Sequence, residues 1–116
     1  MKVKINENIF KVKTLVDEFS QRVGMQKRKF DSEFEGLLFL MGGKEQCFWM
    51  KDCIIPLDII MIKNNVVVNI HHDCPPCKGK NCPSYCGKGN IVLELEGGTC
   101  SQVDIEPGDS VEYILD

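Results

Sequence analysis

Short apolar runs separated by turn-forming residues dominate the chain from residue 36 to its end. Runs of about four to eight residues that are rich in Val, Ile, Leu and aromatics, with Gly, Pro or Asn between them, are typical of β-strands. Asn64 and Asn65 separate two such runs, and Asn tolerates the positive φ that a tight hairpin turn needs. We therefore predict a hairpin at this pair. The predicted strands cover residues 3–5, 9–12, 36–41, 46–51, 57–62, 66–70, 91–96 and 110–115.

One segment near the N-terminus has a helical spacing of apolar residues. Leu15, Phe19 and Val23 lie on one stripe of a helix that Thr14 would cap and Gly24 would end. We predict this helix from residue 14 to about residue 22. The intervening cysteine-rich stretch, residues 73–90, is predicted to be a loop.

Many short strands and one short helix predict a mostly β (α+β) fold, namely a small antiparallel β-barrel or sandwich. The 116 residues are enough for one core and too few for two, so residues 1–116 are expected to form a single domain. A hydrophobic fraction of 43% agrees with a globular protein.

Charge and hydropathy limit the classes of partner that we expect for this chain. The net charge of −3 argues against a nucleic-acid partner, which usually requires a basic surface. No apolar run approaches the length of a membrane span, and the first eight residues alternate charged with apolar side chains, unlike a signal peptide. The sequence therefore predicts a cytoplasmic protein with no membrane partner.

Seven cysteines are many for a chain of this length, and four of them are clustered. Cys74, Cys77, Cys82 and Cys86 follow one another within thirteen residues, a spacing that could give a structural zinc ion its four sulfur ligands. Alternatively, Cys77 and Cys82 form a redox-sensitive disulfide, or all four are free thiols. Because the count of cysteines is odd, disulfides alone cannot pair them all.

A second cluster of interest is the aromatic and charged segment at residues 48–52. On a strand, Trp49 and Lys51 share one face, and Asp58 follows shortly after. An aromatic ring, an ammonium group and a carboxylate on one face are typical of a ligand pocket. The structural alternative is that Trp49 fills the core and Lys51 forms an ion pair with Asp58.

Two glutamates on one predicted strand are the third candidate. Glu94 and Glu96 share a strand face, and paired carboxylates serve in acid–base chemistry or cation binding. The same alternation is also found on the solvent-exposed side of an ordinary sheet. The residues leave both interpretations open.

The order of short motifs resembles one known family. Phe48-Trp49-Met50-Lys51, followed by residues 55–60 (Ile-Pro-Leu-Asp-Ile-Ile), is similar to the signature of the bacterial and archaeal family called "domain of unknown function 192". The resemblance runs from about residue 10 to residue 115. Further similar segments are residues 22–25, 35–39, 75–77, 82–85, 93–98 and 108–111.

What this resemblance implies is mainly a fold, a β-barrel-like domain with a short helix, and it implies no particular reaction. The resemblance also implies a shared pocket, because it places Trp49, Lys51, Asp58, Tyr85 and Glu94 at motif positions. Cys77 and Cys82 belong to the motif, whereas Cys74 and Cys86 do not. A four-cysteine zinc site would then be an elaboration of this branch, and the resemblance favours the disulfide between Cys77 and Cys82.

The leading hypothesis is a non-enzymatic binding module for a small ligand, with the ligand-binding residues just named and the cysteine loop held by zinc or a disulfide. An enzyme is the second hypothesis, either a thiol-redox protein using Cys77 and Cys82 or a hydrolase using Asp58 and Glu94. The third is a structural or assembly module that offers a strand edge to a protein partner.

Overall fold

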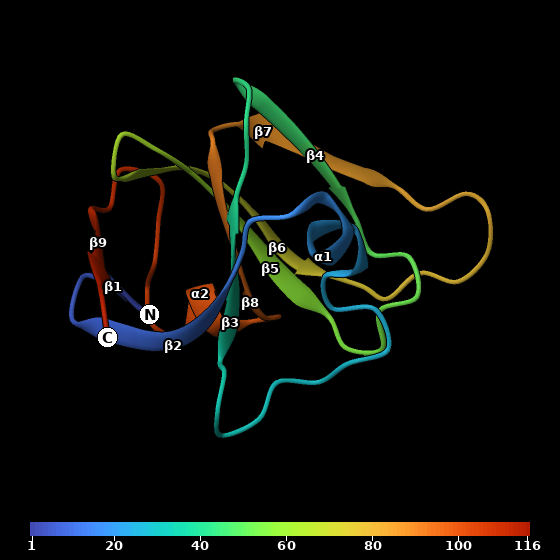
Figure 1. Ribbon diagram of the computed structural model, residues 1–116, viewed down its shortest axis with the longest axis horizontal. Helices are drawn as coiled ribbons and strands as arrows, with labels where there is room; N and C mark the ends of the chain where they lie inside the picture. The colour runs from blue at the N-terminus through green and yellow to red at the C-terminus, as the bar shows by residue number, and fades with distance from the viewer.

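Nine strands and two short helices make up the fold in the computed structural model, which describes residues 1–116. Figure 1 shows their arrangement. In chain order the elements are β1 (Lys2–Ile5), β2 (Asn8–Leu15), α1 (Glu18–Val23), β3 (Gly36–Leu40), β4 (Glu45–Trp49), β5 (Leu57–Lys63), β6 (Val66–Cys74), β7 (Ser84–Lys88), β8 (Ile91–Glu96), α2 (Thr99–Gln102) and β9 (Val111–Ile114).

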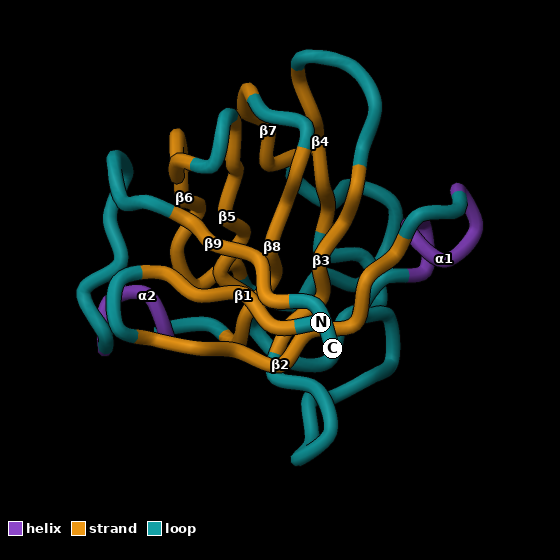
Figure 2. Tube along the Cα trace, turned by 60° about the vertical axis from the view of Figure 1, so that its left-hand side comes forward, coloured by secondary structure: helices purple, strands orange, loops and turns teal.

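Seven strands form one curled sheet in the order β6-β5-β8-β3-β2-β1-β9, and β4 and β7 form a second, smaller sheet. Neighbours are antiparallel except β2 and β3, which are parallel. Figure 2 shows β9, β1 and β2 curling in front of β5, β8 and β3. The two edge strands meet near their ends, where Val67 N–H donates to Asp109 O (2.9 Å) and Val111 N–H donates to Asn65 O (2.8 Å). The predicted fold class is confirmed as a mostly β half-barrel.

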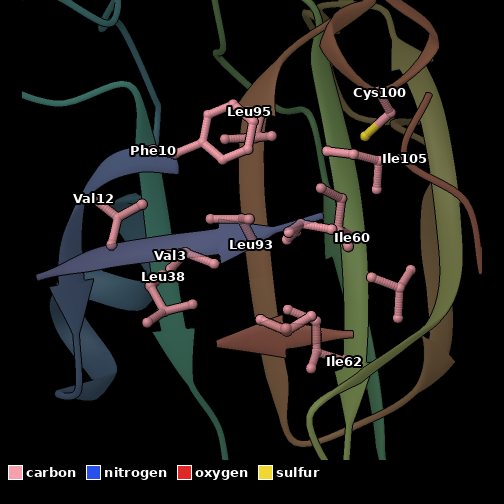
Figure 3. Packing of buried hydrophobic residues seen from close by; sticks show 13 residues of the cluster. Val3, Phe10, Val12, Leu38, Ile60, Ile62, Leu93, Leu95, Cys100 and Ile105 are labelled. Carbon is pink, nitrogen blue, oxygen red and sulfur yellow. The ribbon is translucent and has the colours of Figure 1, made fainter. Parts of the chain in front are cut away.

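Both faces of the central strands are buried, which explains their continuous apolar runs. Alternate residues of a strand point to opposite faces. Leu38, Ile60 and Leu93 therefore join the core enclosed by the curl, which Figure 3 shows between β1, β2 and the central strands. Phe39, Met61 and Val92 lie in a second core on the opposite face.

The predicted hairpin is confirmed, and the predicted helix start is wrong. Asn64 and Asn65 have φ angles of 52° and 60° and join β5 to β6. Thr14 lies in β2, where it pairs with Leu38 of β3, because this segment extends the sheet instead of starting a helix. The helix begins after Asp17, whose carboxylate accepts the N–H of Ser20 at 2.9 Å.

Three further features differ from the sequence prediction. Residues 73–90 were expected to form a loop, but they contain a strand, β7, which pairs with β4. β6 continues to Cys74, beyond its predicted end, and a second short helix, α2, precedes β9. Neither helix has the length and apolar composition needed to span a membrane.

Candidate functional site

A pocket of about 480 Å³ lies on the face of the sheet that α1 and β4 cover in part. Its floor is Glu94 of β8, and its walls come from β3, from α1 with the residues that follow it, and from β4 with the residues that follow it. Slightly more than half of its lining residues are hydrophobic (8 of 15). The lining includes Arg22, Phe39, Phe48, Trp49, Lys51 and Glu94.

Glu94 provides the floor with a carboxyl group. On the neighbouring strands its register partners are Ile59 and Leu37, both apolar. Glu94 is only 3% exposed, and its carboxyl makes no hydrogen bond or ion pair with the rest of the chain. Burial disfavours the charged form and raises the pKa of Glu94 from 4.5 to about 8. The carboxyl is therefore mostly protonated at neutral pH.

The walls of the pocket are largely apolar. The rings of Phe39 and Phe48 meet edge to face with centroids 4.9 Å apart. Met25 and Cys53 complete this part of the lining, and both are buried. Burial raises the pKa of the Cys53 thiol to about 11, with smaller contributions from Glu94 and Asp52, so the thiol stays protonated at neutral pH.

The mouth of the pocket carries aromatic and charged groups. Trp49 is 46% exposed, and the Lys51 Nζ lies 5.2 Å from the centroid of its ring, a cation–π arrangement. Arg22 of α1 forms an ion pair with Glu18 one helical turn earlier, at 3.2 Å. Trp49, Lys51 and Glu94, three of the five predicted ligand-binding residues, thus line one pocket.

Asp58 lies on the opposite face of the sheet from Glu94. Its register partner on β8 is Leu95, and its side chain is fully buried. The carboxylate accepts three backbone N–H groups, from Asp73 at 2.8 Å, Gly98 at 3.1 Å and Cys100 at 2.8 Å. Asp58 therefore ties β5 to the end of β6 and the start of α2. Because the two carboxyl groups lie on opposite faces of the sheet, Asp58 and Glu94 cannot act together on one substrate. The expected ion pair between Asp58 and Lys51 is not formed.

Tyr85 supports the pocket without lining it. It pairs with Phe48 across β4 and β7, and its ring meets that of His71 edge to face at 5.5 Å. It also packs against the second core. Tyr85 thus lies on β7, the strand that pairs with the one carrying Phe48 and Trp49.

The cysteines form two disulfides, and the expected zinc ligands do not converge. Cys47 of β4 is bonded to Cys86 of β7, and Cys77 is bonded to Cys82 in the preceding loop. Cys74 is free and buried at the end of β6. No group of His, Cys, Asp or Glu side chains is arranged to hold a metal ion. The four-cysteine zinc site is therefore a wrong prediction, because strand pairing draws Cys86 to Cys47.

Several lining residues were not singled out from the sequence. Phe39, Met25 and Arg22 reach the pocket from two segments that are far from residues 48–51 in the chain. Gly24, with a φ of 48°, ends α1 and places its backbone against the Phe39 ring, 3.5 Å from where a Cβ would lie. These residues fall in the segments 22–25 and 35–39, whose family resemblance was the available signal.

Two solved structures are similar to this one over nearly the whole chain. A protein of unknown function from Novosphingobium aromaticivorans DSM 12444 is 29% identical, with a TM-score of 0.83 over 97% of this chain and 84% of that chain. A candidate transcription regulator from Sinorhizobium meliloti 1021 is 25% identical, with a TM-score of 0.82 over 96% of this chain and 91% of that one.

The search of curated proteins finds no match. A family model described as "Uncharacterized ACR" matches residues 1–113, almost the entire chain, and it represents the family that the FWMK and IPLDII motifs resemble. The chain belongs to this family, domain of unknown function 192.

Proposed function

We propose that this chain is a non-enzymatic binding domain that holds a small organic ligand in the pocket above Glu94. The observation that carries the proposal is a carboxyl group, 3% exposed and without a protein partner, at the floor of a pocket whose walls are largely apolar. Small-molecule sites are typically concave and apolar, with a few polar groups that fix the ligand's orientation.

The energetics of Glu94 support a role in binding. A buried polar group without a hydrogen bond lowers stability, so most buried polar groups in folded proteins are satisfied. Asp58, in the neighbouring strand, follows this rule with its three N–H donors. The Glu94 carboxyl has no such donors and borders the pocket, and a strongly raised pKa in a cleft is typical of functional sites.

Binding is favoured over catalysis by the other groups in the pocket. The Cys53 thiol, with a pKa of about 11, is a poor nucleophile at neutral pH because the thiolate is the reactive form. The second carboxylate that hydrolysis would use, Asp58, faces the opposite side of the sheet. Cys77 and Cys82 are bonded to each other and do not line the pocket.

We also infer that the protein works in an oxidising compartment, in place of the expected cytoplasm. Two disulfides, Cys47–Cys86 and Cys77–Cys82, support this inference because structural disulfides are rare in reducing compartments. The compartment does not distinguish a small ligand from a protein partner. The burial of the Glu94 carboxyl at the floor of the pocket favours the small ligand, which can reach it.

Trp49 allows a direct test, because it is the only tryptophan of the chain and lies at the mouth of the pocket. A library of small aromatic and aliphatic fragments is titrated while Trp49 fluorescence is recorded. We expect fragments with a polar head to bind, and Glu94→Leu to weaken them about tenfold or more by removing the polar floor. The matched control is Glu96→Leu, which alters an exposed glutamate on the same strand.

The control variant should bind as the wild type does, within about twofold. Circular dichroism verifies that both variants are folded, and leucine suits position 94 because its cross-strand neighbours are apolar. If no fragment at millimolar concentration changes Trp49 fluorescence, or if Glu94→Leu binds the fragments unchanged, the proposed function is wrong.

A further inference from the structure

We propose that the pocket selects ligands that carry a protonated amine or amidine on an apolar body, with the cationic group seated on the carboxyl of Glu94. This inference deepens the proposed function and rests on it. It names the class of ligand, which neither the family nor the similar structures supply.

The floor offers a ligand only one polar side chain that is deeply buried. Glu94 lies between Ile59 and Leu37, and the chain directs no N–H or O–H donor at its oxygens. An ionised carboxylate accepts hydrogen bonds at two oxygens and donates none. The three N–H groups of an ammonium, or the forked pair of an amidinium, provide the donors that the protein does not.

Other head groups fit this floor less well. A carboxylate head would bring a second negative charge, or would have to share the proton of Glu94, in a site shielded from water. A hydroxyl head gains a hydrogen bond without charge. A cationic head gains both a charge pair and charge-assisted hydrogen bonds, which are about twice as strong as neutral ones.

The groups at the mouth of the pocket leave no free site there for a ligand cation. An aromatic face attracts cations, but Lys51 already lies over the Trp49 ring at 5.2 Å. Arg22 is paired with Glu18, so these two charges largely offset each other. The remaining site for a ligand cation is therefore the floor, with the apolar body of the ligand against the wall that Phe39 and Phe48 form together.

Binding of this kind releases a proton. In the free protein at pH 7 the Glu94 carboxyl is protonated, and pairing with an ammonium ion leaves it as a carboxylate, with its proton passing to the buffer. The thiols of Cys53 and Cys74 both have pKa values of about 11 and stay neutral at pH 7. The other charged groups of the lining are Glu18, Arg22 and Lys51.

A set of three probes of equal size separates the head groups: benzylamine, benzyl alcohol and benzoate. Binding is followed by Trp49 fluorescence, and by calorimetry in two buffers of different ionisation enthalpy to count protons. We expect benzylamine to bind at least about tenfold more tightly than benzyl alcohol, benzoate to bind most weakly, and close to one proton to be released per benzylamine at pH 7.

Glu94→Gln keeps the size of the side chain and cannot ionise. It should abolish both the preference for benzylamine and the proton release, while benzyl alcohol binds within about threefold of the wild type. Glu96→Gln is the matched control and should change neither property. Retained alcohol binding also shows that the Glu94→Gln pocket is folded.

The outcomes distinguish this inference from the proposed function. If benzoate or benzyl alcohol binds as tightly as benzylamine, the ligand class is wrong while the binding pocket stands. Benzylamine binding without proton release, and unaffected by Glu94→Gln, would also overturn the ligand class, because the amine would then sit elsewhere. If none of the probes and none of the wider fragment library binds, the proposed function itself fails.

Discussion

Two buried acids on neighbouring strands have different surroundings because their side chains point to opposite faces of the sheet. Asp58 faces the core inside the curl and receives three backbone N–H groups. Glu94 faces the pocket and receives none. The donors to Asp58 come from positions 15, 40 and 42 residues further along the chain. The two buried acids are therefore distinguished by long-range hydrogen-bond donors, which Asp58 has and Glu94 lacks.

The pH dependence of stability should report the burial of Glu94. Below about pH 4.5 the carboxyl is protonated in both the folded and the unfolded chain. Between pH 4.5 and about 8 the unfolded chain loses this proton and the folded chain keeps it, so the free energy of unfolding falls as the pH rises. Above pH 8 both forms are ionised and the loss stays constant. The loss amounts to roughly 3–5 kcal/mol.

Urea unfolding of the wild type and of Glu94→Gln, from pH 4.5 to pH 9, measures this effect. The variant should match the wild type within about 1 kcal/mol at pH 4.5 and be more stable by several kcal/mol at pH 9. Glu96→Gln should follow the wild type throughout, because Glu96 is exposed. A constant difference between wild type and Glu94→Gln across the range would contradict the raised pKa.

At the scale of single residues, Lys51 follows β4, which ends at Trp49, so the strand period of two does not bring these two side chains together. The family resemblance predicted a pocket that Trp49, Lys51 and Glu94 share, and all three line one pocket. It grouped Asp58 and Tyr85 with them, although Asp58 faces the other core and Tyr85 stands behind β4. Strand periodicity gives the relative face of residues within one strand. It does not give the register between strands, which decides that Asp58 lies beside Leu95.

At the scale of elements, local patterns predicted most strands to within one or two residues at each end, and they failed at the end of β2, the start of α1, the end of β6 and the whole of β7. The apolar runs that became β3, β5 and β8 are long enough to be recognised alone. β7 has the sequence Ser-Tyr-Cys-Gly-Lys, which has little strand character, and it forms because β4 supplies its hydrogen-bonding partner. Likewise, pairing with β3 keeps Thr14 extended, and Asp17 then becomes the helix cap.

The two disulfides stabilise the small sheet and the loop before it to different extents. Cys47–Cys86 spans 39 residues, and Cys77–Cys82 spans five. Closing a longer loop removes more entropy from the unfolded chain, which gives about 4 kcal/mol for the first bond and about 2 kcal/mol for the second. We therefore expect Cys47→Ala with Cys86→Ala to reduce stability about twice as much as Cys77→Ala with Cys82→Ala.

Denaturant unfolding of the two double variants, under oxidising conditions, measures the difference. Removing the Cys47–Cys86 bond in the first double variant should also weaken fragment binding, because β4 carries Phe48 and Trp49, which form one wall of the pocket. The pair at 77 and 82, outside the pocket, should leave fragment binding within about twofold. A larger loss of stability from the short-loop pair would contradict this account of the two bonds.

At the scale of the molecule, the pocket exists because the curled sheet has two apolar faces and only one of them is enclosed by the sheet itself. The strands β1, β2 and β9 cover the inner face, and the two chain ends meet there through an ion pair between the Met1 amino group and Asp116 (Figure 2). The outer face is covered by β4, β7 and the six-residue α1, which has no buried side chain. Phe19 of α1 is 72% exposed. A helix this short borders the outer face without filling it, which leaves the hollow above β8.

The most direct test of this account is the titration of Glu94 itself. The ¹³C shift of its side-chain carboxyl carbon is followed from pH 4 to pH 10 by NMR, with the signal assigned by comparison with Glu94→Gln. We expect a midpoint near pH 8 in the free protein, and a midpoint below about pH 6 with saturating benzylamine, since the bound cation favours the carboxylate. A midpoint near pH 4.5, unchanged by benzylamine, would show that Glu94 is neither desolvated nor the site at which a ligand cation binds.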